Sequence, residues 1–312
     1  MDSINYKNEN WSVTPNDVLY LTKTMQDTGN KCTKVHILKN EVRGKIVEEN
    51  IESNIFELTL PGGKKSLFCP ACKQVENQKN IDKLRTDAIT YRRKRETLLV
   101  LEKDSVFSDK TLKSASFAEY LEMDSETTAA RNSCRIFAKR YLNNEIFNVI
   151  LTGNSGVGKS HLSMSILNAV NNHANPWKSC LYVSLSRVFI LLKDSWDNKE
   201  SQYTEKYFLE LLDSADILVI DDLGAETGAS NSIRQASDFT HTVLTSILDG
   251  RQDKATIITS NLNIDKLSNM YDERVMDRIF SRAKGNVIEF REAKSYRLHH
   301  KESIKNEMGT NE

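Results

Sequence analysis

The fold of this chain is decided by residues 146–162, IFNVILTGNSGVGKSHL. The apolar run 146–151 predicts a buried strand. The pattern Gly-x-x-x-x-Gly-Lys-Ser follows, and apolar residues at helical spacing come next. This order of strand, glycine-rich loop and helix predicts a phosphate-binding loop, because glycines let backbone N–H groups converge on phosphate oxygens. The alternative is a glycine-rich turn that only caps a helix, and the flanking patterns argue against it.

Two side chains of the loop have distinct expected roles. Lys159 would reach the β- and γ-phosphates, and the Ser160 hydroxyl would take one coordination position of Mg²⁺. The dipole of the helix that begins near Lys159 favours the same anion. The expected nucleotide-binding residues are Gly153, Asn154, Ser155, Gly156, Val157, Gly158, Lys159, Ser160 and His161.

A second apolar run, residues 217–220, follows Asp216 and ends in Asp221 and Asp222. This pattern predicts a buried parallel strand with two carboxylates at the edge where open α/β sheets bind ligands. We expect Asp221 to hold Mg²⁺ and Asp222 to orient or deprotonate the attacking water, as in a Walker B element. On its own, such an acid pair would often be a helix cap.

Polar groups also follow a third apolar strand, residues 255–260. Asn261 is expected to contact the γ-phosphate or the attacking water, although a turn asparagine is the alternative. Further on, Arg274, Arg278 and Arg282 have the i, i+4, i+8 spacing of one helical stripe. The stripe is either a solvated face or the source of an arginine finger for a neighbouring subunit. A last strand is expected at residues 286–290.

The N-terminal part is different in character. Cys32-x-x-x-His36 precedes strand-like segments at 42–47 and 51–60, and Cys69-x-x-Cys72 ends the region. Cys-x-x-Cys is a common half of a zinc site, and Cys32 and His36 would supply the other half. The segment is too short and polar to hold a core without such a staple. Plain reduced thiols remain an alternative; a redox pair lacks the surrounding βαβ pattern.

Composition bounds the remaining interpretation. The chain has 312 residues, and its 43 basic and 43 acidic side chains give a net charge of zero, so a basic surface would have to be local. No apolar stretch has the length of a membrane span, and the polar N-terminus is unlike a signal peptide, so we expect a cytoplasmic protein. Its cysteines should then be thiols or metal ligands, with Cys134 and Cys180 in the core.

The rest of the chain predicts mostly helices. We expect a short helix after Pro15, a charged helix over 77–104 that contains the basic cluster 92–95, and helices over 125–142 and 186–213. A strand is expected at 180–185. The polar segment 104–115 indicates a linker, which places the border between two domains near residue 110.

In this order, the motifs resemble those of the AAA+ ATPases and, more closely, the DnaC/DnaI-type helicase loaders of bacteria and their phages, with the IstB transposition ATPases as relatives. The matching segments, within roughly residues 115–300, are 153–160, 218–224, 258–262, 273–278 and 295–297. The resemblance implies that Asn261 is sensor 1, Arg278 the arginine finger and Arg297 the sensor 2 residue. Asp222 stands where many AAA+ proteins have glutamate, which implies slow, switch-like ATP hydrolysis. The N-terminal region resembles the zinc-binding, helicase-docking domain of the DnaI type.

The expected fold is therefore an α/β AAA+ P-loop core with a central parallel sheet (111–312) and a small α+β zinc-ribbon-like domain (1–110). The resemblance implies an ATP-dependent loader that places a hexameric replicative helicase on single-stranded DNA and self-associates through the ATPase domain. ATP, Mg²⁺ and Zn²⁺ are the expected cofactors. Three alternatives remain: an IstB-like transposition helper, a helicase-binding inhibitor or adaptor with weak ATPase activity, and a small-molecule kinase, for which no acceptor pocket is evident.

Overall fold

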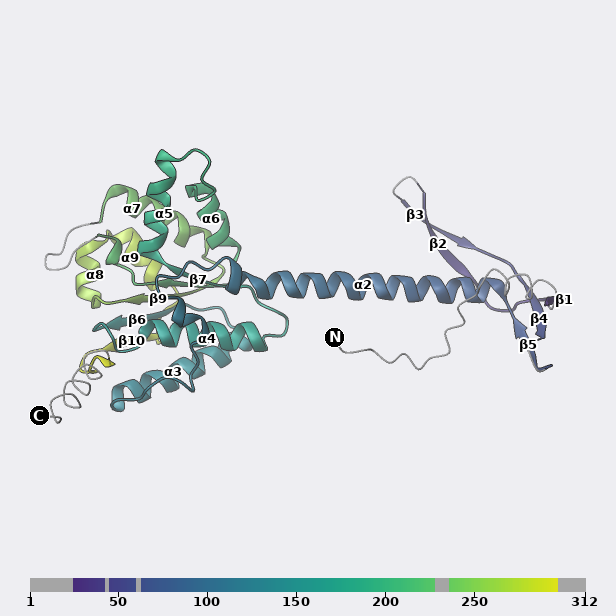
Figure 1. The fold of residues 1–312 in the computed structure, drawn as a ribbon, viewed down its shortest axis with the longest axis horizontal. Helices are drawn as coiled ribbons and strands as arrows, with labels where there is room; N and C mark the ends of the chain where they lie inside the picture. The colour runs from purple at the N-terminus through teal and green to yellow at the C-terminus, as the bar shows by residue number, and fades with distance from the viewer. Residues whose placement is uncertain (1–24, 43–44, 60–62, 228–235, 297–312) are drawn as a thin grey trace, which may run out of the picture. The chain divides into compact units, whose positions relative to one another are not determined.

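The computed structural model describes residues 25–42, 45–59, 63–227 and 236–296 (Figure 1). The helix expected after Pro15 and the sensor residue Arg297 lie outside this part of the chain. The chain divides into two compact units, Met1–Tyr91 and Arg92–Glu312. This border lies inside helix α2 (Pro70–Lys103), earlier than the border expected near residue 110.

The first unit is rich in β-structure, as expected. It contains an antiparallel sheet with the order β1-β4-β5, a separate antiparallel pair β2-β3 and the first part of α2. Their bounds are β1 Met25–Lys31, β2 Ile37–Val42, β3 Lys45–Asn50, β4 Asn54–Thr59 and β5 Lys65–Phe68. The strand expected over 42–47 instead falls on the end of β2 and the start of β3. Among the described residues before Arg92, only His36, Leu38 and Ala71 are buried, so the apolar core is very small.

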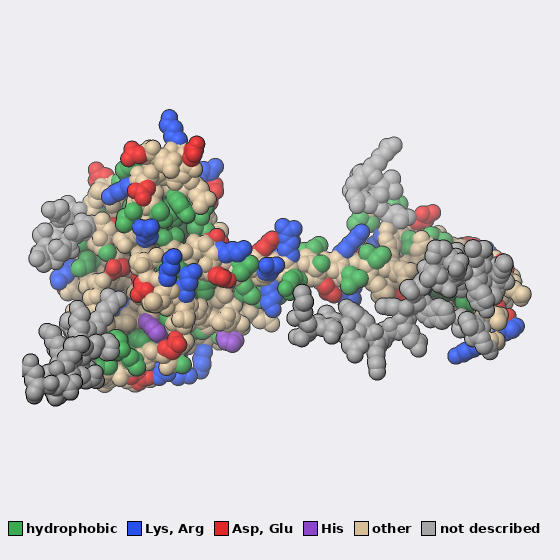
Figure 2. Space-filling model, in the orientation of Figure 1, with side chains coloured by type: hydrophobic (Ala, Val, Ile, Leu, Met, Phe, Trp, Pro, Cys, Tyr) green, Lys and Arg blue, Asp and Glu red, His purple; other side chains and the backbone are tan. Residues whose placement is uncertain are grey.

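Helix α2 confirms the expected charged helix but begins earlier, at Pro70. Proline is favoured as the first residue of a helix, where its missing N–H is not needed. Figure 2 shows basic side chains along α2, which carries the cluster 92–95. Two members of this cluster have partners: Arg92 pairs with Glu96 at 2.8 Å, and the Lys94 ammonium lies over the Trp177 ring.

The second unit is built on a parallel sheet of five strands in the order β10-β6-β9-β8-β7. The strands are β6 Val149–Gly153, β7 Cys180–Ser184, β8 Ile217–Asp221, β9 Ala255–Ser260 and β10 Val287–Phe290. Every pair of neighbours is parallel. The sheet brings the ends of β6, β8 and β9, which carry the predicted functional residues, to one edge.

Helices cover both faces of this sheet (Figure 1). Alternate strand residues pack toward two apolar cores: Leu151, Val219 and Ile257 belong to one, and Ile150 and Leu218 to the other. The first core contains residues of α3 (Ser125–Leu142) and α4 (Lys159–His173). The second contains residues of α5 Leu185–Asp197, α6 Glu205–Ser214, α7 Asp238–Gly250, α8 Ile264–Met270 and α9 Glu273–Phe280. The expected α/β class with a central parallel sheet is confirmed.

Several local expectations need correction. The first strand covers 149–153 rather than 146–151, and the helical region 186–213 is divided into α5 and α6. Helix α9 ends at Phe280, and Arg282 follows with a φ of 54°, so Arg282 does not continue the arginine stripe. Cys134 and Cys180 are fully buried, as expected of core thiols, and burial raises the pKa of each to about 12.

The segment 104–115 is part of the second unit and packs against its sheet rather than being a linker. Phe107 stacks on Tyr182 with ring centroids 4.8 Å apart, and Val106 forms a parallel bridge to Val183 of β7. The short helix η1 (Lys110–Ser114) follows. The polar composition of the segment 104–115 gives no indication of this packing, because the apolar residues that it contacts are far away in the sequence. Within the described residues, no helix has the length and apolar character needed to cross a membrane.

Candidate functional site

The phosphate loop connects β6 to α4, as the sequence predicts. Gly153 ends β6 with a φ of 120°, and a Cβ there would lie 2.1 Å from the carbonyl oxygen of Phe290. Gly158 precedes α4 with a φ of 88°, and a Cβ would lie 2.5 Å from the Tyr120 ring. Both positions therefore require glycine for conformation and for space. The start of α4 faces the loop, which favours an anion there.

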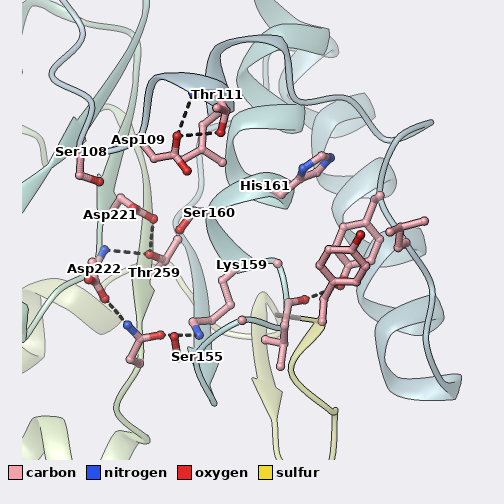
Figure 3. A pocket seen from close by; sticks show the side chains of 18 of the residues that line it. Ser108, Asp109, Thr111, Ser155, Lys159, Ser160, His161, Asp221, Asp222 and Thr259 are labelled. Atoms are coloured by element: carbon pink, nitrogen blue, oxygen red, sulfur yellow. Dashed lines mark hydrogen bonds between the residues drawn. The ribbon is translucent and has the colours of Figure 1, made fainter. Parts of the chain in front are cut away.

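A cavity of about 500 Å³ opens beside this loop (Figure 3). Its volume lies within the range of small-molecule sites. Its walls come from the loop, the ends of β8 and β9, the segment before α3, and the C-terminal segment. The lining residues are Ser108, Asp109, Thr111, Leu112, Glu119, Tyr120, Leu121, Ser155, Gly156, Val157, Gly158, Lys159, Ser160, His161, Asp221, Asp222, Thr259, Asn261 and Tyr296.

Lys159 is held inside the loop by three oxygen acceptors. Its Nζ donates to the carbonyl oxygens of Gly153 at 2.8 Å and Asn154 at 2.7 Å, and to Oδ1 of Asn261 at 2.9 Å. Burial lowers the pKa of the Lys159 ammonium to about 8, although the charges of Asp222 and Asp221 oppose the shift. A phosphate group would offer this ammonium stronger, charged acceptors than the three neutral oxygens.

Hydrogen bonds join the two acids to β9. Thr259 Oγ1 donates to Asp221 Oδ1 at 2.7 Å and accepts from the Asp222 backbone N–H at 2.9 Å. Asn261 Nδ2 donates to the Asp222 carboxylate, while Asn261 Oδ1 accepts from Lys159. Asp222 has a φ of 62°, an uncommon conformation for a residue other than glycine. The structure thus brings Lys159, Asp221, Asp222 and Asn261 together, as the sequence predicts.

Other site residues carry no motif. Tyr120 donates from its hydroxyl to the Val157 carbonyl at 2.8 Å, and His161 Nε2 donates to the Ser116 carbonyl at 2.8 Å. Both bonds tie the segment before α3 to the phosphate loop. Ser108, Asp109, Thr111 and Glu119 line the cavity from the same segment. Sequence reasoning missed Ser108, Asp109 and Thr111 because their segment resembles a linker, and Glu119 because no motif includes it. For Thr259, the only signal was its position at the end of a strand.

Arg278 is not among the residues that line the cavity. It lies on α9, where its guanidinium donates to Asp249 at 2.6 Å and to Asp277 at 2.8 Å. Arg274 of the same helix also pairs with Asp249, at 3.3 Å. A catalytic role for Arg278 would therefore be exerted on a neighbouring subunit, and it stays a prediction.

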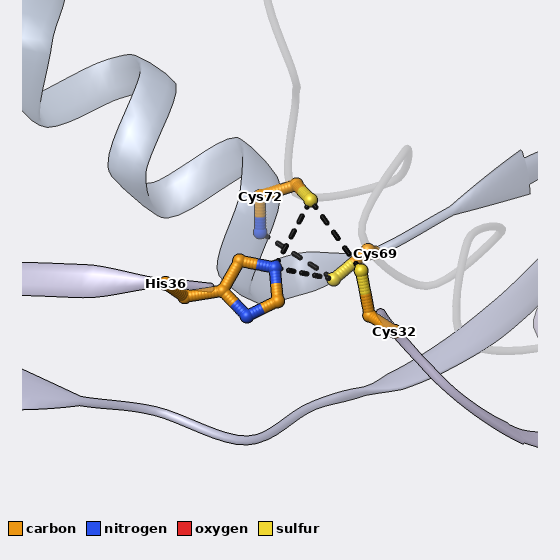
Figure 4. Close-up of side chains that lie close together, drawn as sticks. All are labelled: Cys32, His36, Cys69 and Cys72. Atoms are coloured by element: carbon orange, nitrogen blue, oxygen red, sulfur yellow. Dashed lines mark hydrogen bonds between the residues drawn. The ribbon is translucent and has the colours of Figure 1, made fainter. Parts of the chain in front are cut away.

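The first unit contains the expected cluster of metal-ligand side chains (Figure 4). The ligand atoms of Cys32, His36, Cys69 and Cys72 all lie within 4.8 Å of one another. The Cys32 and Cys72 sulfurs are 3.7 Å apart, and His36 Nε2 lies 3.1 Å from Cys72 Sγ and 3.5 Å from Cys69 Sγ. A tetrahedral zinc ion with ordinary bond lengths would need edges of about 3.5–3.8 Å. The residues therefore fit zinc with only small adjustments.

The local structure explains how this irregular spacing converges. Cys69 and Cys72 flank the start of α2, while Cys32 follows β1 and His36 precedes β2. The backbone N–H of Cys32 donates to Ser53, and that of Ile51 donates to His36, which fixes both chain segments. His36 Nδ1 lies 3.0 Å from the Ile51 carbonyl, to which it can only donate. This bond leaves Nε2 with the lone pair that a metal requires.

Comparisons with known proteins bear on the phosphate loop and its surroundings. A family model described as "IstB-like ATP binding protein" matches residues 71–304. The "Replicative helicase loader DnaC" of Buchnera aphidicola subsp. Schizaphis graminum (strain Sg) is 32% identical over 147 residues, which cover 46% of this chain and 55% of the relative. The protein of that name from Escherichia coli (strain K12) is 29% identical over 136 residues, 43% of this chain and 50% of the relative. The chain thus spans about half the length of these curated relatives.

A solved structure, "Crystal structure of the DnaC helicase loader", is also similar. It is 22% identical, has a TM-score of 0.48, and the match covers 59% of this chain and all of that one.

Proposed function

Because the chain belongs to the family of IstB-like ATP-binding proteins, we propose that it is an ATP-dependent loader of a hexameric replicative helicase. In this proposal the second unit binds ATP with Mg²⁺, assembles with copies of itself and contacts single-stranded DNA. The first unit docks on the helicase. Two relatives that this chain matches over about half of their length are named replicative helicase loader. Their name supports helicase loading over other functions of ATP-binding proteins.

The observation that carries the proposal is the chain of hydrogen bonds from Lys159 through Asn261 to Asp222. A γ-phosphate that takes over the Lys159 ammonium would break its bond to Asn261. The Asn261 side chain could then turn, and Asp222 would lose or change its partner. Binding of ATP would therefore change the hydrogen bonds at the ends of both β8 and β9. Such a change on binding is the behaviour of a nucleotide switch.

The same geometry supports slow hydrolysis. Bound Mg²⁺ would supply charge stabilisation at the phosphates. In this proposal Ser160 and Asp221 would hold it; both line the cavity, and Thr259 donates a hydrogen bond to the Asp221 carboxylate. Asp222 would orient the attacking water, but aspartate is one methylene shorter than glutamate, and the Asp222 carboxylate accepts a hydrogen bond from Asn261. A switch needs only occasional turnover, so this arrangement suits a loader.

The test uses the full chain and the replicative helicase of the organism that carries it. Size exclusion with mass determination should detect a complex with ATP and a weaker one with ADP. Lys159→Ala should lose this nucleotide dependence, whereas Lys206→Ala, at an exposed lysine of α6, should keep it. The pair Cys69→Ser with Cys72→Ser should lose the complex in every nucleotide state, because docking is assigned to the first unit.

A second candidate is a transposition helper ATPase, because the matching family model takes its name from IstB. Absence of a helicase complex in any nucleotide state would favour it and would leave the assignment of ATP binding unchanged. ATPase activity separates a loader from an inhibitor or adaptor. An inhibitor or adaptor would bind the helicase but show no ATPase activity with or without single-stranded DNA.

A further inference from the structure

The hydroxyl of Tyr182 is buried without a hydrogen-bond partner. Tyr182 lies in the middle of β7 and is fully buried, and its hydroxyl oxygen forms no hydrogen bond with any described residue. The other buried tyrosines of this region behave differently: Tyr141 and Tyr120 both donate to backbone carbonyls. A buried phenol normally has such a partner, because an unmet hydrogen bond is costly. The exception needs an explanation.

The strand register places Tyr182 on the same face of the sheet as Asp221. Ser184 pairs with Asp221 in the parallel ladder of β7 and β8, so Tyr182 lies two residues back. Because side chains alternate, Tyr182 and Asp221 share one face of the sheet. The offset of two residues is about 6.6 Å along a strand, which a tyrosine side chain can span. Accordingly, the Asp221 carboxylate and the Ser160 hydroxyl both lie close enough to interact with the phenol.

Tyr182 is also held firmly in place. Phe107 stacks on its ring with an interplanar angle of 12°. The Tyr182 N–H donates to Ser105 Oγ at 3.0 Å, and its carbonyl accepts from Val106 N–H at 2.9 Å. Asp221 and Ser160 line the nucleotide cavity, whereas Tyr182 does not. The hydroxyl therefore lies in a layer beneath the two residues assigned to Mg²⁺.

The opposite side of Asp221 already has an orienting hydroxyl. Strand β8 lies between β9 and β7, and Thr259 of β9 donates to Asp221 Oδ1 at 2.7 Å. We propose that Tyr182 is a second positioning residue of the Mg²⁺ site, whose hydroxyl donates to the Asp221 carboxylate when the metal is bound. Two neighbouring strands would then fix the carboxylate from both sides. This inference rests on the nucleotide binding proposed above.

The protonation state suits this role. A phenol hydroxyl ordinarily carries its proton at neutral pH. Toward a carboxylate it can therefore act only as a donor. Such outer partners of metal ligands typically change metal affinity by about 10–100-fold when they are removed.

The test is Tyr182→Phe in the full chain, which removes one oxygen and keeps the stacked ring. Mg²⁺ is titrated at a fixed concentration of a fluorescent ADP analogue, and analogue affinity is measured separately in EDTA. We expect the half-saturating Mg²⁺ concentration to rise about tenfold, with unchanged affinity in EDTA. The melting temperature without metal should stay constant or rise, since no protein hydrogen bond is lost.

Tyr141→Phe is the matched control. It removes the hydroxyl of a buried tyrosine that donates to the Phe147 carbonyl at 3.0 Å, so it should lower the melting temperature and leave the Mg²⁺ requirement unchanged. An unchanged Mg²⁺ requirement in Tyr182→Phe, or an equal loss of affinity with and without Mg²⁺, would overturn the inference and leave Tyr182 a core residue. If the unmutated chain binds no nucleotide in either buffer, the proposed function fails as well.

Discussion

Removal of metal from the cluster of Cys32, His36, Cys69 and Cys72 should unfold the first unit and leave the second folded. The perturbation is a strong chelator or, in a separate sample, Cys69→Ser with Cys72→Ser. The full chain as purified should contain about one zinc ion per molecule. Both treatments should reduce that content to near zero.

The expected magnitude follows from the small apolar core of this unit. Among its described residues, Leu38 and Ala71 are the only buried apolar side chains. Full burial of a leucine contributes about 1.5–3 kcal/mol. Zinc binding to short peptides with such ligands contributes about 10–16 kcal/mol at neutral pH. Loss of the metal therefore removes much more free energy than this apolar core can supply.

Amide hydrogen exchange, resolved by peptide with mass spectrometry, measures the two units separately in the same sample. Protection in β1 to β5 should disappear after chelation, while protection in β6 to β10 should persist. Re-addition of zinc should restore the first set. Cys134→Ser is the matched control, because this fully buried thiol of α3 lies outside the cluster and should leave the zinc content unchanged.

A metal-free chain with undiminished protection in β1 to β5 would refute the reasoning. The four side chains would then be ordinary thiols and an imidazole, and the fold of this unit would rest on its strand pairing alone.

Two further predictions concern the ATP site. Burial lowers the pKa of Lys159 to about 8 in the free chain, and bound phosphates would keep its ammonium charged. Affinity for ADP, measured by calorimetry, should therefore be constant at low pH and fall roughly tenfold from pH 7 to pH 9; a flat profile would contradict this. Arg278→Ala should keep ADP affinity but lose ATPase activity, and mixing it with Lys159→Ala chains should restore part of that activity. The Arg274→Ala control should stay active, and failure of the mixture to recover would count against a role across subunits.

The sequence predicts the centre of the nucleotide site well because that site obeys local rules. Strands β6, β8 and β9 are short buried segments rich in apolar residues, and the predicted functional residues lie at their carboxyl ends or in the loop that follows. Parallel strands bring these ends to one edge of the sheet. The proximity of Lys159, Asp221 and Asn261 can therefore be predicted although they are far apart in the sequence.

The walls of the cavity were not predictable in this way. Tyr120 lines the cavity and donates a hydrogen bond to Val157, which is 37 residues further along the chain, and local sequence does not reveal this contact. Periodicity also fails to show where a helix stops. The spacing of Arg274, Arg278 and Arg282 fits one helix, but the helix ends at Phe280, and the third arginine takes a left-handed conformation.

The pairing of Val106 with β7 has a practical consequence for any shortened form of this protein. Strand β7 is one of the two edge strands of the parallel sheet, and its side away from β8 would present free N–H and C=O groups. Val106 satisfies the Tyr182 carbonyl and the Ser184 N–H there, and Ser105 Oγ accepts from the Tyr182 N–H. A fragment that starts at residue 110 would expose this edge as a template for another chain. A fragment that starts before Arg92 would carry its own cover and should remain dispersed in solution.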